Sequence, residues 1–206
     1  HKASTDPTAR CNEIGGLALP FHCDGSDLVG LMCLANGIDG GLSAVANSVL
    51  IHNTLVRERP DLAEALYGEF PYDYRGEQRD GGKPFYSVPV FTEHGGRLFV
   101  RGIPPYIWAS QRQQEALRAL VAMADDPRHH LLMELLPGDI QFINNYHVLH
   151  GRTAYEDDRE QGQIRHLKRL WLETTVLTDR PEHFTNRGSH WETKRSASRL
   201  RAGVDT

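Results

Sequence analysis

Two short motifs, far apart in the chain, carry side chains of the types that bind transition metals. His22 and Asp24 are two residues apart, and side chains at that spacing on a β-strand point to the same face. An ordinary surface histidine and aspartate beside a turn would show the same spacing. The pair therefore predicts a metal site only if a third ligand comes from another part of the chain.

The second half of the chain offers that third ligand. His147 and His150 are three residues apart, an odd spacing that sends two side chains of a strand to opposite faces. At most one of them can join His22 and Asp24, and the spacing does not say which. Two histidines and one carboxylate, with open positions opposite them, form the facial triad of non-haem Fe(II) oxygenases.

A pair of arginines follows these histidines. Arg165 and Arg169 are four residues apart in a segment typical of a strand, so we expect both on one face with Leu167 between them. A guanidinium that faces the core is costly unless it pairs with an anion, and its planar fork matches a carboxylate. The pair predicts a ligand with two carboxylates. The alternative is a solvated basic strand edge, because His166 and Lys168 alternate with the arginines.

A weaker signal lies between the two metal-binding motifs. Gly40 and Gly41 are followed closely by Ser43. The glycines allow a tight backbone turn, and the serine hydroxyl can donate a hydrogen bond to a carboxylate oxygen. An ordinary surface loop would explain the same residues.

The elements that must position these residues are mostly short strands. Segments with β-branched or aromatic content occur at residues 17–21, 28–34, 42–46, 85–91, 97–101, 131–135, 140–144 and 166–172. Helices are predicted at residues 48–57, 61–67 and 113–124. Ser48 is the expected cap of the first, and Pro60 opens the second. Many short strands with a few inserted helices favour a mainly β fold of the double-sheet, jelly-roll type.

Composition and charge narrow the class of protein. The chain has 206 residues, Lys+Arg 23, Asp+Glu 27 and a net charge of −4, so we expect no nucleic-acid partner. No run reaches the ~18 apolar residues of a membrane span, so we expect a soluble, cytoplasmic protein without a membrane partner. The expectation is a single domain over residues 1–206 that binds a small molecule, with residues 181–206 as a polar, peripheral tail.

Cysteine usage agrees with a reducing compartment. Cys11, Cys23 and Cys33 are odd in number and show no Cys-x-x-Cys spacing. This pattern favours neither a disulfide framework nor a thiolate zinc site.

Taken together, the motifs resemble the taurine dioxygenase family of Fe(II)- and 2-oxoglutarate-dependent oxygenases, which also contains the 2,4-dichlorophenoxyacetate and clavaminate enzymes. The stretches that carry the resemblance are residues 19–24 (LPFHCD), 138–145 (GDIQFINN), 149–152 (LHGR) and 165–171 (RHLKRLW). The resemblance implies a double-stranded β-helix with a cupin-like core. It also implies iron ligands His22, Asp24 and His150, and so favours His150 over His147.

The same resemblance implies how 2-oxoglutarate would bind. Ser43 falls where the family commonly has a threonine that contacts the distal carboxylate of 2-oxoglutarate. Arg165 matches the arginine that pairs with that carboxylate, and Arg169 matches one nearer the keto-acid head and the substrate. Whether Arg169 meets an acidic group of the substrate or serves the co-substrate stays open.

The implied reaction uses Fe(II), 2-oxoglutarate and dioxygen to oxidise an unactivated C–H bond of a small molecule, with hydroxylation as the default and succinate and CO2 as co-products. Asp24 argues against halogenation, because related halogenases lack this carboxylate. Desaturation, epoxidation and ring formation stay open, as does assembly into a homo-oligomer. The alternatives are a cupin-like metal-binding module, or a non-oxidative isomerase or lyase on the same three ligands.

Two departures from the family pattern stand out. Only 21 residues precede His22, whereas the family usually has a considerably longer N-terminal part that contributes strands and substrate-side loops. Residues 110–114 join a strand-like stretch to a helix abruptly, where relatives carry a longer, proline-containing loop. We expect either a natural deletion there or an active-site lid that this sequence lacks.

Overall fold

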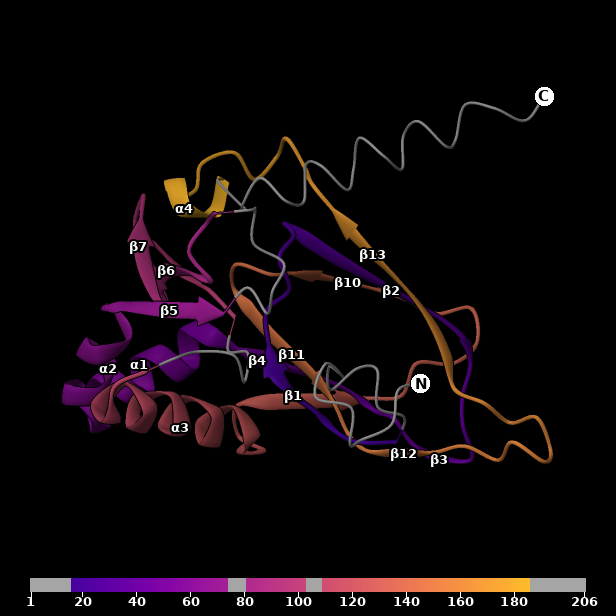
Figure 1. The fold of residues 1–206 in the computed structure, drawn as a ribbon. Helices are drawn as coiled ribbons and strands as arrows, with labels where there is room; N and C mark the ends of the chain where they lie inside the picture. Colours follow the sequence, from indigo (N-terminus) through magenta and orange to yellow (C-terminus); the bar gives the residue numbers. More distant parts are fainter. Residues whose placement is uncertain (1–15, 74–80, 103–108, 186–206) are drawn as a thin grey trace, which may run out of the picture.

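The fold is known from a computed structural model that describes residues 16–73, 81–102 and 109–185 (Figure 1). Cys11 and most of the predicted tail, residues 186–206, lie outside these ranges. Within the described ranges, no helix is long and apolar enough to cross a bilayer.

The two largest sheets of the fold are both antiparallel. The four-stranded sheet has the order β1 (Leu19–His22), β11 (Val148–Arg152), β4 (Ser43–Asn47) and β9 (His130–Met133). The three-stranded sheet has the order β10 (Ile140–Asn144), β2 (Leu28–Ala35) and β13 (His166–Leu172). Neighbouring strands in both sheets come from distant parts of the chain (Figure 1).

Three helices cover one face of the four-stranded sheet. They are α1 (Ser48–Glu58), α2 (Pro60–Leu66) and α3 (Gln111–Asp125). Their apolar faces, with Leu55 and Leu120 fully buried, join one core with Ala46 and Leu149 of the sheet. Because side chains alternate along a strand, the neighbours of Ala46 and Leu149 face away from this core. His150 is one of these neighbours.

The helix starts differ from the predicted ones. The side chain of Asn47 accepts hydrogen bonds from the backbone N–H groups of Val49 and Leu50, so Asn47 is the cap of α1 and the prediction of Ser48 was wrong. The Ser48 hydroxyl instead donates to the carbonyl of His147 at 2.6 Å. Helix α3 begins two residues before the predicted start.

Two two-stranded ladders lie near the helices, and one strand from each replaces the single strand predicted at residues 85–91. Their strands are β5 (Glu69–Asp73), β6 (Phe85–Pro89), β7 (Phe91–His94) and β8 (Arg97–Val100). Strand β6 pairs with β5, and β7 pairs with β8. The break comes at Val90, whose N–H donates to Leu66 and whose carbonyl accepts from Arg101, so Val90 joins neither ladder.

Two smaller elements complete the described chain. Strands β3 (Asp39–Gly40) and β12 (Tyr155–Glu156) form a two-residue ladder. The short helix α4 (Glu182–Thr185) begins within the segment predicted as a peripheral tail. Its Phe184 is buried, with its ring centre 5.4 Å from that of Phe99 and 5.0 Å from that of Tyr146.

A buried charge holds three loops together. Asp27, just before β2, is fully buried. Its carboxylate accepts hydrogen bonds from the Arg180 guanidinium at 2.6 Å, from the backbone N–H of Thr174 at 2.8 Å and from the Tyr146 hydroxyl. Burial acts to lower the pKa of Arg180, but its interactions with Asp27 and Tyr146 together outweigh burial and raise that pKa. The network ties the start of β2 to the β10–β11 turn and to the segment after β13.

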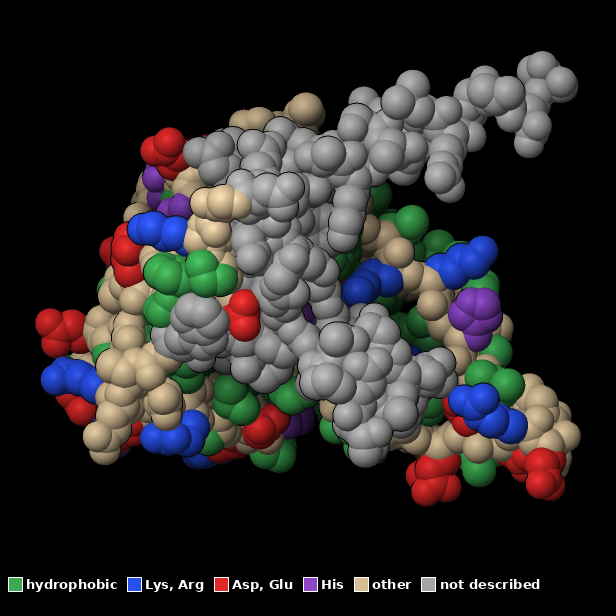
Figure 2. Space-filling model, in the orientation of Figure 1, with side chains coloured by type: hydrophobic (Ala, Val, Ile, Leu, Met, Phe, Trp, Pro, Cys, Tyr) green, Lys and Arg blue, Asp and Glu red, His purple; other side chains and the backbone are tan. Residues whose placement is uncertain are grey.

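The outer face of the three-stranded sheet is apolar and exposed. Phe142, Gly30 and Leu170 lie side by side across its three strands, and Ile140 and Met32 form the next row with Lys168. Phe142 is 62% exposed and Leu170 is 59% exposed. Figure 2 shows hydrophobic side chains, with Lys and Arg among them, over the region of β2 and β13.

Candidate metal centre

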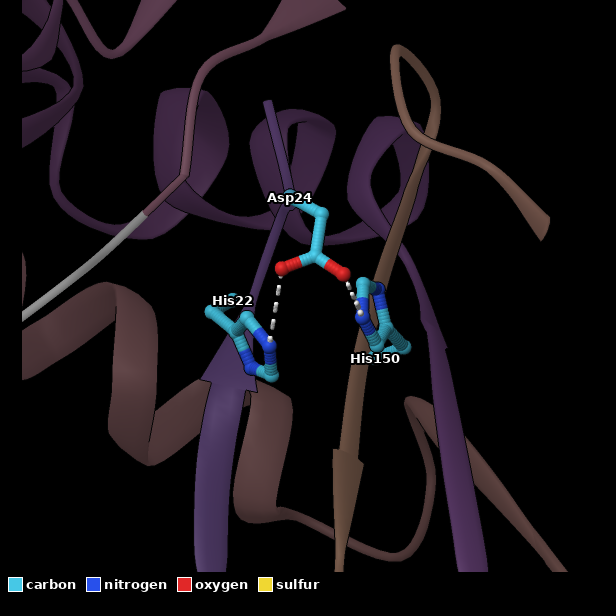
Figure 3. Close-up of side chains that lie close together, drawn as sticks. All are labelled: His22, Asp24 and His150. Carbon is cyan, nitrogen blue, oxygen red and sulfur yellow. Dashed lines mark ion pairs between the residues drawn. The ribbon is translucent and has the colours of Figure 1, made fainter. Parts of the chain in front are cut away.

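Strands β1 and β11 bring the two histidines of the centre together. His22, the last residue of β1, lies directly opposite His150 in the antiparallel ladder with β11. The centres of the two rings are 4.3 Å apart. Asp24 follows two residues after His22, just beyond the end of β1, and its carboxylate points between the two rings (Figure 3).

The three side chains present their ligand atoms to one another. The His22 Nε2 lies 3.7 Å from Asp24 Oδ1, and the His150 Nε2 lies 3.7 Å from Asp24 Oδ2 (Figure 3). One ligand atom from each residue lies within 4.8 Å of the others. Among the residues that the structure describes, this is the one group of three or more His, Cys, Asp or Glu side chains that could hold a metal ion.

His22 is prepared to act as a neutral ligand. Its Nδ1 lies 2.8 Å from the carbonyl oxygen of Pro20, which can only accept a hydrogen bond. The proton of the neutral ring therefore sits on Nδ1, and the lone pair of Nε2 faces Asp24. Burial, reinforced by the neighbouring charge of His150, lowers the pKa of His22 to about 4. The ring is therefore uncharged near pH 7, as metal binding requires.

Asp24 is held as an oriented carboxylate. Its Oδ2 accepts hydrogen bonds from the indole N–H of Trp171 at 2.8 Å and from Arg169 at 3.3 Å. Burial alone would raise the pKa of Asp24, but its interactions with His150 and Arg169 outweigh burial and hold that pKa well below its usual range. The carboxylate is therefore charged at neutral pH, and its Oδ1 is left facing His22.

His147 lies outside this group. Its Nδ1 is 2.7 Å from the carbonyl oxygen of Leu98, and its ring centre is 5.2 Å from that of Phe99. His150 is 5% exposed, and its Nδ1 has no hydrogen-bond partner within the described part of the chain. The structure thus brings His150, and not His147, to the His22 and Asp24 side chains.

The donor set fits a divalent transition metal of the iron type. Two imidazoles and one carboxylate are the ligands of the facial triad, which leaves positions open for other molecules. The fixed tautomer of His22 and the hydrogen bonds to Asp24 are the outer contacts that such ligands usually have. These features make the centre suited to Fe(II).

The two arginines reach the centre from different positions. Arg169 lies within β13 and contacts Asp24 directly. Arg165 precedes β13. The ladder between β13 and β2 shifts register between His166 and Leu167, so the alternation of side chains along β13 does not extend to Arg165. Its guanidinium donates to the carbonyl of Gly41 at 3.2 Å.

Gly41 and Ser43 lie on the approach to β4. Gly41 has φ +73, and a Cβ there would lie 2.6 Å from Arg165 Nε, so only glycine fits this position without a shift. Ser43 begins β4, where an ordinary loop was the alternative, and is buried. Its hydroxyl donates to the side-chain oxygen of Gln141 at 2.8 Å.

The contacts that Trp171 and Asn145 make with Asp24 were not predicted from the sequence. Trp171 was only part of a motif, although its spacing from Arg169 places both on one face of β13. That spacing could have predicted its contact with Asp24. The side-chain oxygen of Asn145, which accepts from the backbone N–H of Asp24 at 3.3 Å, gave no such signal.

Comparison with known sequences identifies a family. Residues 2–171 match the profile described as "Taurine catabolism dioxygenase TauD, TfdA family". FR-33289 synthase of Streptomyces rubellomurinus (strain ATCC 31215) is 35% identical over 167 residues, which are 75% of this chain and 49% of that protein. Enduracididine beta-hydroxylase of Streptomyces hygroscopicus is 33% identical over 172 residues, which are 73% of this chain and 50% of that protein. The chain thus spans about half the length of these curated relatives.

Solved structures confirm the predicted fold. The structure of asparagine oxygenase in complex with Fe(II), 2S,3S-3-hydroxyasparagine and succinate superposes with a TM-score of 0.61 at 24% identity. The match covers 78% of this chain and 51% of that one. The mainly β fold with a double-stranded β-helix core is therefore the fold of this chain.

Proposed function

Because this chain belongs to the TauD, TfdA family of taurine catabolism dioxygenases, we propose that it carries the catalytic centre of an Fe(II)- and 2-oxoglutarate-dependent dioxygenase. The reaction would oxidise an unactivated C–H bond of a small molecule, with hydroxylation as the outcome. The observation that carries this proposal is the convergence of His22, Asp24 and His150 within 4.8 Å.

These three residues would hold the metal through His22 Nε2, the Asp24 carboxylate and the His150 ring. Bound Fe(II) would supply the activation of dioxygen that couples decarboxylation of 2-oxoglutarate to oxidation of the substrate. The protein contributes a neutral His22 ring and a charged Asp24 carboxylate at neutral pH, so neither of these two side chains has to lose a proton before the metal binds.

Arg165 and Ser43 would bind the distal carboxylate of 2-oxoglutarate. The guanidinium of Arg165 is partly buried, where a charge-assisted hydrogen bond to a carboxylate is strong. Ser43 has a single hydroxyl proton, which is donated to Gln141 here, so it would change partner when the co-substrate binds. Fixing the distal end orients the keto acid toward the metal.

Arg169 would bind an acidic group close to the metal. Its guanidinium contacts Asp24 on one side and lies over the Trp171 ring, with its Cζ 5.1 Å from the ring centre. The names of similar proteins support a substrate of the amino-acid class, which carries a carboxylate. One relative is an enduracididine beta-hydroxylase, and asparagine oxygenase was solved with 3-hydroxyasparagine.

Iron binding and oxygen-dependent turnover of 2-oxoglutarate test this function. The protein is loaded with Fe(II) without oxygen and titrated with 2-oxoglutarate, which should produce a weak visible charge-transfer band. Admission of oxygen with candidate amino acids should release succinate. His22→Ala and Asp24→Ala should abolish both signals, because each removes one of three ligands.

A matched control shows whether the loss of iron comes from removing a metal ligand or from removing any histidine. His166 is exposed at the start of β13, and His166→Ala should keep both the band and the iron. Iron retained by His22→Ala, or iron bound by the unmodified protein without any oxygen-dependent succinate, would contradict the proposal. The second result would favour the non-oxidative isomerase, lyase or binding module.

A further inference from the structure

Two guanidinium groups lie against one aromatic ring of β12, the strand that follows β11 along the chain. The Cζ of Arg152 is 4.4 Å from the centre of the Tyr155 ring, and the Cζ of Arg165 is 5.3 Å from the same point. Tyr155 itself is buried. Both cations therefore share one small, partly buried region.

Each arginine retains an unused hydrogen-bond donor. Arg152 donates from Nη2 to the carbonyl of Leu17 at 2.7 Å, and Arg165 donates from Nη2 to the carbonyl of Gly41 at 3.2 Å. Arg152 Nη1 and Arg165 Nε are buried and have no partner in the described part of the chain. Buried donors of charged groups normally have partners, so these two atoms indicate a missing acceptor.

The pair lacks a carboxylate at salt-bridge distance among the described residues. Neither arginine forms a salt bridge with a residue in the described ranges, and the nearby Asp157 uses one oxygen to accept the backbone N–H of Arg165. Two like charges in this setting are unfavourable until an anion arrives.

The strand geometry places Arg152 on the co-substrate side of the sheet. Arg152 follows His150 by two residues in β11, so both side chains leave the strand on the same face. In the ladder with β4, Arg152 lies directly opposite Ser43. Ser43 and Arg165 are the residues proposed above to bind the distal carboxylate, so Arg152 adjoins both of them.

We propose that Arg152 is a second arginine for the distal carboxylate of the 2-oxo acid, which would then lie between Arg152 and Arg165. This inference rests on the proposed function and adds a specificity-determining residue to it. A carboxylate has enough lone pairs to accept from both unused donors. Arg152 would thereby favour a 2-oxo diacid over a 2-oxo monoacid of the same length.

The test compares two keto acids that differ only at the distal end. The Fe(II)-loaded protein is titrated calorimetrically without oxygen with 2-oxoglutarate and, separately, with 2-oxopentanoate, which has a methyl group in place of the distal carboxylate. Arg152→Gln should weaken 2-oxoglutarate binding roughly ten- to hundredfold, the effect of one lost charged hydrogen bond. It should leave 2-oxopentanoate binding unchanged. Arg152→Lys, which keeps the charge, should weaken 2-oxoglutarate binding less.

The control is Arg128→Gln, which removes an exposed arginine paired with Asp126 and should alter neither affinity. Equal weakening for both acids, or no weakening for either, would overturn the inference, because a purely structural arginine does not distinguish them. If thermal melting shows that Arg152→Gln does not fold, the affinities of Arg152→Lys for the two keto acids are compared instead. Weaker binding of 2-oxoglutarate alone then supports the inference, and equal changes for both acids overturn it. Failure of the unmodified protein to bind 2-oxoglutarate would instead contradict the proposed function.

Discussion

At the scale of single residues, Trp171 orients the carboxylate of Asp24, the proposed metal ligand. Its indole N–H donates to Asp24 Oδ2 at 2.8 Å, which leaves Oδ1 toward His22. We expect Trp171→Phe, which keeps an aromatic ring but removes the donor, to weaken Fe(II) binding about 10- to 100-fold, as losses of such outer contacts do. Competition with a chelator without oxygen measures the affinity.

A surface tyrosine supplies the control for this change. Tyr67→Phe removes one hydrogen bond to Glu93 at the end of α2 and should leave iron affinity as it is. If Trp171→Phe binds iron as tightly as the unmodified protein does, the indole does not orient Asp24.

Gly41 offers a test of the Arg165 position. Gly41→Ala introduces a Cβ 2.6 Å from Arg165 Nε in a backbone with φ +73. We expect a loss of roughly 1–2 kcal/mol of stability from the left-handed backbone alone, and in addition weaker binding of 2-oxoglutarate because Arg165 must move. Urea unfolding and calorimetric titration measure the two effects separately.

Gly81 provides a matched comparison, because its φ is +75 and a Cβ there would meet nothing within 4 Å. Gly81→Ala should lose a similar amount of stability and keep its affinity for 2-oxoglutarate. Equal affinities in both variants would mean that Arg165 does not bind the co-substrate from this position.

Sequence reasoning reaches some of these residues and not others, for a physical reason. The period of a strand predicts that His22 and Asp24 share a face, but it cannot say which strand lies alongside, so it leaves His147 and His150 equivalent. The choice of His150 came from the family resemblance. The unused donor of Arg152 depends on contacts between distant segments, which no local spacing encodes.

At the scale of elements, the loops between strands depend on a buried ion pair. Arg180 donates to the fully buried Asp27 and also to the Tyr146 hydroxyl. Arg180→Met would leave the Asp27 charge without its cation, so we expect a loss of about 3–5 kcal/mol in the free energy of unfolding, the range for breaking a buried pair. Urea denaturation, monitored by circular dichroism, measures this free energy of unfolding.

An exposed ion pair on the surface is the control for the buried one. Arg128 donates to Asp126 at 2.6 Å on the surface, where ion pairs contribute about 0–1 kcal/mol, so Arg128→Met should change stability little. Similar small losses for both variants would show that the Asp27 network does not stabilise the fold.

The elements also show why some strands were not predicted. Strand β5 has Pro71 at its centre, and a proline cannot donate to a ladder, which argues against a strand. The strand forms because β5 belongs to a two-stranded ladder with β6, where one edge of each strand needs no partner. Strand β11 is short and contains polar residues, so only its pairing with β1 and β4 identifies it.

At the scale of the whole molecule, the two sheets differ in what covers their outer faces. Helices α1, α2 and α3 cover the four-stranded sheet, whereas Phe142, Leu170 and their neighbours leave the outer face of the three-stranded sheet apolar and exposed. Gly30 lies between Phe142 and Leu170, so the two large side chains extend one continuous surface. Contiguous apolar surface of this kind is uncommon on a soluble monomer.

This face predicts how the purified 206-residue chain behaves. We expect the native protein to bind an apolar fluorescent dye, and we expect Phe142→Ser combined with Leu170→Ser to remove most of that signal, because both side chains are more than half exposed. Val176→Ser, at an exposed position outside the sheet, should leave the signal as it is. Iron affinity should stay the same in all variants, since Phe142 and Leu170 lie on the face of their strands opposite to Arg169 and Trp171. A native protein that does not bind the dye would mean that this surface is covered in solution.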